Sequence, residues 1–230
     1  MSFGITRVHP CPPGSVAVDV AGERFIALPE RALYWPRQGM LLIADLHLGK
    51  SDIFRAFGVA VPQSVQMDDL GRLDGLLVRL APAALVILGD FVHGAFVGPQ
   101  TRERWQALRD THPATRVILT RGNHDRTLSA AQWNLDSVMG EWMGDGVLLS
   151  HEPRHKRDGA PCFSLNIHGH IHPVFRDRQW RRGLPALVHE GLHLAMPAFS
   201  AFTAGVSCHT AQSRVWVFLA DGDPLVLQVR

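Results

Sequence analysis

The sequence predicts an α/β fold in which a sandwich of two β-sheets is flanked by helices. Three observations support this expectation. Short apolar runs end in polar residues, helical segments separate these runs, and the last third of the chain is a series of short β-rich stretches. Strands that alternate with helices are typical of βαβ units and a largely parallel core. The final stretches should add further strands to that core.

The first half of the chain supplies the alternating elements. VAVDVAGERFIALP, residues 16–29, is expected to form a strand pair that turns near Gly22. Residues 63–80 follow Pro62 with apolar side chains at helical spacing, and TRERWQALRD predicts a second helix. Continuously apolar runs predict three buried strands, at residues 40–45, 84–90 and 116–123.

The last third changes character and contains no helical pattern. Short strands are expected at residues 146–151, 163–169, 173–180, 186–190, 192–196, 214–220 and 224–229. No repeat, low-complexity tract or linker interrupts the chain. We therefore expect one domain over residues 1–230, with residues 1–30 as an N-terminal strand elaboration.

Composition excludes several classes of protein. Hydrophobic residues make up 46% of the 230 positions and charged residues 19%, which excludes extensive disorder. No apolar run approaches the roughly 18 residues that cross a bilayer, so no membrane partner is expected. The N-terminus lacks an export signal, and the three cysteines are too few and too widely spaced for a disulfide framework. These features favour a cytoplasmic protein.

Polar residues follow five of the apolar runs, and they are the strongest functional signal. The carboxyl ends of neighbouring strands in α/β proteins converge on one crevice, where functional sites lie. The chain also has 13 histidines, and imidazole is the commonest metal-ligating group. Seven candidate ligands would meet there: Asp45, His47, Asp90, Asn123, His151, His170 and His172. Oxygen and imidazole ligands without thiolates suit manganese, iron or zinc. Seven ligands are more than one tetrahedral site can use. They suit two ions about 3.5 to 4 Å apart that share a carboxylate.

The ordered motifs DxH, GD, GNHD, SH and GHxH, between Leu41 and Pro173, resemble those of the calcineurin-like metallophosphoesterase superfamily. This resemblance implies the two-sheet metallophosphoesterase β-sandwich. It also implies ligand roles: Asp45, His47 and His172 for one metal, Asn123, His151 and His170 for the other, and Asp90 as the bridge. His124 would be the general acid for the leaving oxygen, while a metal-bridging hydroxide attacks phosphorus.

A longer match, from Leu33 to Gly205, includes LYWPRQGMLLIADLHLGK and MPAFSAFTAG. It resembles the bacterial ligase-associated DNA-damage-response metallophosphoesterases, described as endonucleases of single-stranded DNA. The resemblance implies two divalent ions, manganese first with iron and zinc as alternatives. It further implies DNA as substrate and a functional link to an ATP-dependent DNA ligase and a helicase.

The residue type at position 93 differs between subfamilies of this superfamily. Protein phosphatases of the superfamily carry an aspartate three residues after the bridging one, and here that residue is His93. GD followed by this histidine resembles the double-strand-break repair exonucleases, in which it helps manage the scissile phosphate. The resemblance therefore makes His93 a second candidate catalytic residue and favours a phosphodiester substrate.

Arginine accounts for nearly all the basic residues and offers candidate phosphate contacts. Arg121 and Arg126 flank the GNHD turn, where they would clamp a phosphate oxygen or form surface ion pairs. The segment after GHxH predicts either a basic patch that follows a nucleic-acid backbone or a solvent-exposed hairpin tip. It contains Arg176, Arg178, Trp180, Arg181 and Arg182.

Two other functions remain open from the sequence. One is a small-molecule phosphoesterase acting on nucleotides or sugar nucleotides, because the fold alone does not decide the substrate. The other is a non-catalytic protein-binding scaffold, as in the retromer subunit of this superfamily. All seven ligands and His124 are present, which argues against the scaffold.

Overall fold

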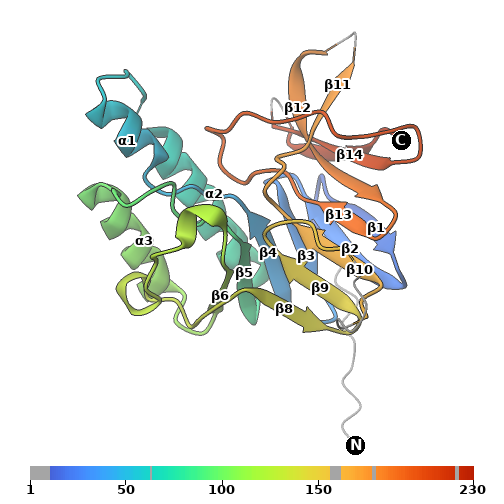
Figure 1. The fold of residues 1–230 in the computed structure, drawn as a ribbon, viewed down its shortest axis with the longest axis horizontal. Coiled ribbons are helices and arrows are strands. Elements are labelled where there is room, and N and C mark those ends of the chain that lie inside the picture. Colours follow the sequence, from blue (N-terminus) through green and yellow to red (C-terminus); the bar gives the residue numbers. More distant parts are fainter. Residues whose placement is uncertain (1–10, 63, 156–161, 178–179, 221–222) are drawn as a thin grey trace, which may run out of the picture.

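The computed structural model describes residues 11–62, 64–155, 162–177, 180–220 and 223–230, with the side chains of 180–182 excepted. Two mixed β-sheets face each other, and helices cover the outer face of the first sheet (Figure 1). The predicted α/β sandwich flanked by helices is therefore confirmed. Within the described residues, no helix is long and apolar enough to cross a membrane.

Among the described residues, the first sheet has seven strands, which lie in chain order. They are β1 (Val16–Val20), β2 (Glu23–Leu28), β3 (Ala32–Trp35), β4 (Met40–Ala44), β5 (Ala84–Leu88), β6 (Arg116–Thr120) and β7 (Ser137–Met139). Strands β1 to β4 form an antiparallel meander, whereas β4 to β7 are parallel. The carboxyl ends of β4, β5 and β6 consequently lie at the same edge of the sheet.

The second sheet is built from the C-terminal part of the chain. Its strands are β8 (Glu141–Gly144), β9 (Val147–Ser150), β10 (Leu165–His168), β12 (Trp180–Glu190), β13 (His193–Ala195), β14 (Arg214–Leu219) and β15 (Leu225–Gln228), with β11 (Val174–Asp177) paired to β12. Strands β9, β10 and β13 are parallel to one another. The loops after β9 and β10 thus leave the sheet at one edge, beside the ends of β4 and β5 (Figure 1).

In the part of the chain that the structure describes, three α-helices accompany the first sheet: α1 (Lys50–Ala56), α2 (Ser64–Leu80) and α3 (Pro99–Thr111). Single turns of 3-10 helix follow β6, at Asn123–Asp125 and Ala131–Trp133. Helix α3 begins with a proline at its first position, where the missing N–H would have had no partner. Helices α2 and α3 bury their apolar faces against the sheet.

Alternation along the central strands divides the core into two layers. In β4, Leu41 and Ile43 face the helices, while Leu42 faces the second sheet. In β5, Ile87 faces the helices and Val86 faces the second sheet. All are fully buried, and burial of each large side chain stabilises the fold by roughly 1.5 to 3 kcal/mol. The site at the ends of β4 and β5 therefore stands on strands packed from both faces.

Most predicted elements are present, and among the described residues four strands or α-helices were not predicted from the sequence patterns. Strands β1 and β2 occupy the expected N-terminal pair and extend the first sheet. The unpredicted elements are β3, α1, β7 and β8. Each is short, and only β3 is buried along its whole length, so periodicity gives little signal.

Candidate metal centre

Tight left-handed turns follow β4, β5 and β10 and carry five of the predicted ligands. Positive φ angles between 48° and 67° occur at Asp45, His47, Asp90, His170 and His172. Such angles are uncommon for residues other than glycine and cost of order 1 to 3 kcal/mol each. These five positions lie together at one edge of the two sheets, where the turns after β4, β5 and β10 meet.

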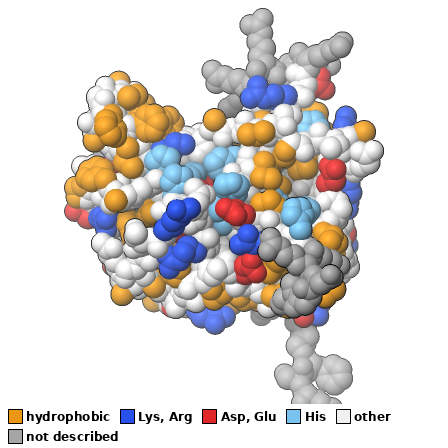
Figure 2. Space-filling model, viewed as in Figure 1, with side chains coloured by type: hydrophobic (Ala, Val, Ile, Leu, Met, Phe, Trp, Pro, Cys, Tyr) orange, Lys and Arg blue, Asp and Glu red, His pale blue; other side chains and the backbone are white. Residues whose placement is uncertain are grey.

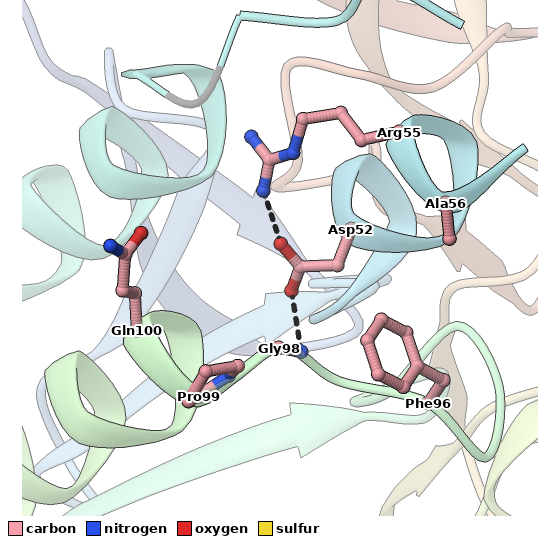
Figure 3. A pocket seen from close by; sticks show the side chains of 7 residues that line it. All are labelled: Asp52, Arg55, Ala56, Phe96, Gly98, Pro99 and Gln100. Carbon is pink, nitrogen blue, oxygen red and sulfur yellow. Dashed lines mark hydrogen bonds and ion pairs between the residues drawn. The ribbon is translucent and has the colours of Figure 1, made fainter. Parts of the chain in front are cut away.

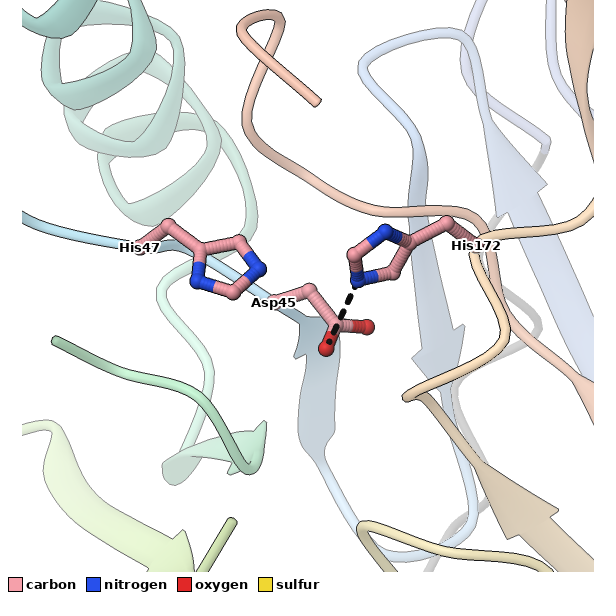
Figure 4. Close-up of side chains that lie close together, drawn as sticks. All are labelled: Asp45, His47 and His172. Carbon is pink, nitrogen blue, oxygen red and sulfur yellow. Dashed lines mark ion pairs between the residues drawn. The ribbon is translucent and has the colours of Figure 1, made fainter. Parts of the chain in front are cut away.

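Asp45, His47 and His172 form the first group of side chains. One ligand atom from each lies within 4.8 Å of the others, and Figure 4 shows the carboxylate between the two imidazoles. His172 Nε2 is 3.2 Å from Asp45 Oδ1, while its Nδ1 is 3.1 Å from the Ala204 carbonyl. His47 Nε2 is buried with no hydrogen-bond partner, as expected of a nitrogen that ligates a metal.

Around His151 lies the second group. Its Nδ1 is 3.0 Å from the Leu88 carbonyl, an arrangement in which Nδ1–H donates and Nε2 presents a lone pair. That Nε2 lies 3.0 Å from Asn123 Oδ1 and 3.1 Å from His170 Nδ1. Asp90 Oδ1 is 3.5 Å away. Potential ligand atoms gathered at these distances fit a cation between them.

Asp90 lies between the two groups. Its Oδ1 faces His151, whereas its Oδ2 is 4.0 Å from His47 Nε2. The side chain is almost fully buried, and Oδ1 also accepts a hydrogen bond from the His124 backbone N–H at 3.0 Å. One oxygen toward each group is the arrangement that a bridging carboxylate requires.

Two glycines permit the close approach of these turns. Gly89 has φ +72°, and a Cβ there would lie 2.2 Å from His151 Nδ1. At Gly122 a Cβ would lie 2.3 Å from the Asp90 backbone nitrogen. No larger residue fits at either position without displacing a candidate ligand.

Asp125 fixes the GNHD turn, although the sequence analysis gave it no role. Its Oδ2 accepts N–H groups from Gly122 at 3.0 Å and Phe91 at 3.3 Å, and its Oδ1 accepts that of Val92 at 3.2 Å. The pKa of Asp125 is raised, because the effect of burial outweighs that of the hydrogen bonds from these N–H groups, which lower it. The carboxylate ties the turn after β6 to the turn after β5. Its place as the fourth residue of GNHD was the available signal.

His93 and His124 stand at the open side of the centre. Their rings stack with centroids 4.9 Å apart, and the His124 side chain is 35% exposed. Burial lowers the pKa of His93 to about 4, with smaller contributions from Lys50 and His124, so its imidazole is neutral at neutral pH. His93 Nδ1 is 3.4 Å from His47 Nδ1. The structure therefore brings both histidines beside the predicted ligands.

Electrostatics differ between two members of the first group. Burial, assisted by Lys50, lowers the pKa of His47 to about 2. The pKa of His172 is raised: burial lowers it, but its hydrogen bond to Asp45 and the charge of that carboxylate together raise it further. A neutral imidazole is the form that ligates metals, and His47 is held in that form.

The arginines predicted to bind phosphate occupy different positions. Arg121 donates to the carbonyls of Asp125, Arg126 and Leu128, so this guanidinium braces the loop. Arg126 is exposed. Both line a cavity of about 260 Å³ whose lining also includes Asn123, His151 and Arg154. Figure 2 shows histidines gathered in the middle of this face with basic side chains beside them.

The arginine-rich segment after GHxH is only partly described. Arg176 is exposed. The other members of the predicted patch, Arg178, Trp180, Arg181 and Arg182, have side chains outside the described part of the structure. The choice between a nucleic-acid patch and a solvated hairpin tip therefore stays a prediction.

A larger cavity, of about 420 Å³, lies between α1 and the start of α3 (Figure 3). Its lining includes Phe96 and Gln100 but none of the candidate ligands. Asp52 is buried at its edge, where it pairs with Arg55 and accepts the Gly98 N–H at 2.8 Å. The carboxylate is thereby used in joining α1 to α3.

Known proteins resemble this chain in sequence and fold. Residues 40–222 match the Calcineurin-like phosphoesterase family. The crystal structure of Pseudomonas putida nuclease MPE is 32% identical, with a TM-score of 0.75, over 93% of this chain and 100% of that chain. Yfce, a phosphoesterase from E. coli, is 15% identical over 83% of this chain and 97% of its own, with a TM-score of 0.46. No curated protein matches the sequence.

The family match covers far more than half of the chain, and the MPE structure aligns over its full length. The expected superfamily is thus confirmed, and with it a hydrolase whose relatives act on phosphoesters. The chain belongs to the calcineurin-like phosphoesterase family.

Proposed function

We propose that this protein is a dinuclear-metal phosphodiesterase that cuts single-stranded DNA as an endonuclease. The observation that carries the proposal is a pair of adjoining candidate ligand groups, Asp45 with His47 and His172 and Asp45 with Asp90 and His151. The Asp90 carboxylate extends from His151 Nε2, at 3.5 Å, toward His47 Nε2, at 4.0 Å. The similarity to a protein described as a nuclease supports nucleic acid as substrate. The cavity beside the second group is lined by Arg121, Arg126, Arg154 and Glu152, and the exposed Arg126 supports a phosphate contact there.

The ligand assignment follows the two groups. Asp45, His47 and His172 would hold one ion, Asn123, His151 and His170 would hold the other, and Asp90 would be shared. Hard oxygen donors with imidazoles and no thiolate suit manganese, with iron and zinc as alternatives. When bound, two such ions supply a nucleophile at neutral pH by lowering the pKa of water, and they neutralise charge on the phosphate.

His124 is the proposed general acid. Its backbone N–H is held by Asp90 Oδ1, and its partly exposed ring can reach a leaving oxygen outside the buried ligand cluster. His93 stacks on that ring and fixes its orientation. As a neutral imidazole, His93 also offers a hydrogen bond toward the substrate without adding charge. Arg126 is proposed to contact a flanking phosphate.

A substrate panel tests the proposal. The protein is assayed with manganese on circular single-stranded DNA, duplex DNA, a chromogenic diester and monoester, and free nucleotides. We expect linearisation of the circular strand and cleavage of the diester, both abolished by chelation and by Asp90→Ala. Activity confined to nucleotides or sugar nucleotides would replace this function with that of a small-molecule phosphoesterase.

The cellular role follows from the same resemblance. We propose DNA repair as the setting, with a functional link to an ATP-dependent DNA ligase and a helicase. Co-purification with either enzyme, compared between the wild-type protein and an inactive Asp90→Ala variant, checks for direct association. Loss of viability after DNA damage in a deletion strain, restored by the wild type only, checks the role itself.

A further inference from the structure

A loop of residues 199–206, called the 199–206 loop below, contacts two candidate ligands of the first group through its backbone. The Ser200 N–H donates to the Asp45 carbonyl at 3.3 Å. Further along the loop, the Ala204 carbonyl lies 3.1 Å from His172 Nδ1. The position of this loop therefore affects the positions of both ligands.

The contact at Ala204 determines which nitrogen of His172 faces the centre. Because a carbonyl oxygen only accepts hydrogen bonds, Nδ1 must carry the proton, and Nε2 then presents its lone pair 3.2 Å from Asp45 Oδ1. A second hydrogen bond, from the Val206 N–H to the His172 carbonyl at 3.1 Å, holds the backbone of this ligand. Hydrogen-bond partners of this kind orient metal-ligating histidines.

Asp69 anchors the 199–206 loop to α2. Its side chain is fully buried, and both carboxylate oxygens accept the Ala201 N–H at 3.2 Å. Arg72, one turn further along α2, places Nη2 3.0 Å from Asp69 Oδ1 and also donates to the Phe199 carbonyl. The two charged side chains thus hold two backbone groups of the loop, one N–H and one C=O.

A third charged side chain acts on the backbone between these two groups. Arg31, which follows β2, donates to the Ser200 carbonyl at 3.3 Å. Charged side chains therefore bind three consecutive residues of the loop. Burying a carboxylate is costly even when it is paired, and hydrophobic replacements of buried ion pairs often stabilise a fold. Packing of α2 does not need these charges, whereas fixing the loop backbone does.

We propose that Asp69 is a positioning residue of the metal centre. Together with Arg72 it holds the 199–206 loop, and the loop in turn holds both ligands. This inference rests on the ligand roles in the proposed function, but not on DNA as the substrate. Because His172 and Asp45 belong to the first group, Asp69 should affect the ion held there and leave the ion of the second group nearly unaffected.

The test variant is Asp69→Asn. An asparagine there can still accept the Ala201 N–H through one oxygen, but it offers no charge to Arg72. Calorimetric titration of the metal-free protein measures the two manganese affinities, and urea unfolding measures stability. The affinities are the decisive readout, because a residue with a purely structural role would change only stability.

Asp74→Asn is the matched control. It makes the same chemical change on the same helix, where the Asp74 carboxylate pairs with Arg104 at 3.0 Å and with His112 at 2.7 Å. These partners join α2 to α3 and its end, and they do not belong to the 199–206 loop. The control should keep both manganese affinities, whatever its effect on stability.

We expect Asp69→Asn to weaken manganese binding at one site by roughly 10- to 100-fold, as for other residues that orient metal ligands, and to leave the other site unchanged. At limiting manganese, electron paramagnetic resonance should show single ions in place of coupled pairs. Cleavage of the chromogenic diester should need more manganese, while kcat at saturating manganese approaches that of the wild type.

Unchanged manganese affinities in Asp69→Asn would overturn the inference. Equal weakening of both sites, or the same weakening in Asp74→Asn, would overturn it as well. If Asp69→Asn does not fold, Arg72→Met decides the question, because it keeps the carboxylate and removes the donor to the Phe199 carbonyl. That variant should weaken the same site, and unchanged affinities would again overturn the inference.

These outcomes are separable from those of the proposed function. If the wild type cuts no DNA but Asp69→Asn loses affinity at one site, the nuclease proposal fails and the Asp69 inference stands. If the wild type cuts DNA and Asp69→Asn binds both ions normally, the Asp69 inference fails and the nuclease proposal stands.

Discussion

Replacing Asp125 with asparagine should loosen the metal centre without removing any ligand. The Asp125 carboxylate accepts three backbone N–H groups, two through Oδ2 and one through Oδ1. In Asp125→Asn, one of these oxygens becomes an NH₂ group. With the amide oxygen at the Oδ2 position, the N–H groups of Gly122 and Phe91 keep an acceptor, and that of Val92 faces a donor.

The magnitude follows from that geometry. One buried N–H without a partner costs about 1 to 3 kcal/mol, and the two remaining hydrogen bonds lose the strengthening from a charged acceptor. Asparagine carries no charge, so the variant avoids the cost of burying the carboxylate, which raises the pKa of Asp125, and this offsets part of the loss. We therefore expect the free energy of unfolding to fall by roughly 2 kcal/mol. Since Asp125 joins the turns of Asp90 and Asn123, metal occupancy at limiting manganese should fall as well.

Urea unfolding of the metal-free protein measures the first effect, and elemental analysis after equilibration with limiting manganese measures the second. Asp110→Asn is the matched control, because it makes the same chemical change at an exposed residue that accepts a hydrogen bond from Gln106 within its helix. Exposed substitutions of this kind change stability by less than about 0.5 kcal/mol. An Asp125→Asn variant indistinguishable from Asp110→Asn in both measurements would refute the positioning role.

Three further outcomes are expected. Asp90→Ala should abolish diester cleavage and reduce bound manganese, and retention of both metals with near-normal turnover would exclude the bridge. His124→Ala should keep its metal yet lower kcat by roughly 10² to 10⁴, less for good leaving groups, and equal losses for nitrophenyl and alkyl-like leaving groups would exclude a proton donor. Burial and the cross-strand neighbour Arg214 lower the pKa of His189 in the folded state. The unfolded chain therefore binds a proton more readily at this residue, and the free energy of unfolding should decrease as the pH falls below about 6.5. Denaturation of metal-free His189→Gln between pH 7.5 and 5 should show a shallower decline than the wild type, and parallel curves would contradict this.

Sequence patterns were sufficient for the strands on which the site stands. The apolar runs before Asp45 and Asp90 are buried on both faces, and such strands read as continuous hydrophobic segments. Their order also placed the polar residues at one edge, because parallel neighbours end together. The role of Asp125 needed coordinates, because Asp125 acts through backbone N–H groups of a turn 33 to 34 residues away.

The arginines show a different limit. Arg121 and Arg126 are equally close to the GNHD motif in sequence, yet one guanidinium braces carbonyl groups and the other lies at the surface. Sequence proximity to a motif cannot distinguish a side chain that supports a loop from one that faces solvent. That distinction depends on where three loop carbonyls point, which local residue preferences do not determine.

The left-handed turns at the ligands have an evolutionary consequence. Glycine or asparagine adopts positive φ more readily than aspartate or histidine does, so drift without selection for chemistry would replace residues such as His47 and Asp90 while the fold persisted. Chains of this architecture that have taken up purely structural duties should therefore show small or amide residues at these positions. Among homologues, the side chains at these five positions would report retained catalysis more directly than overall similarity does.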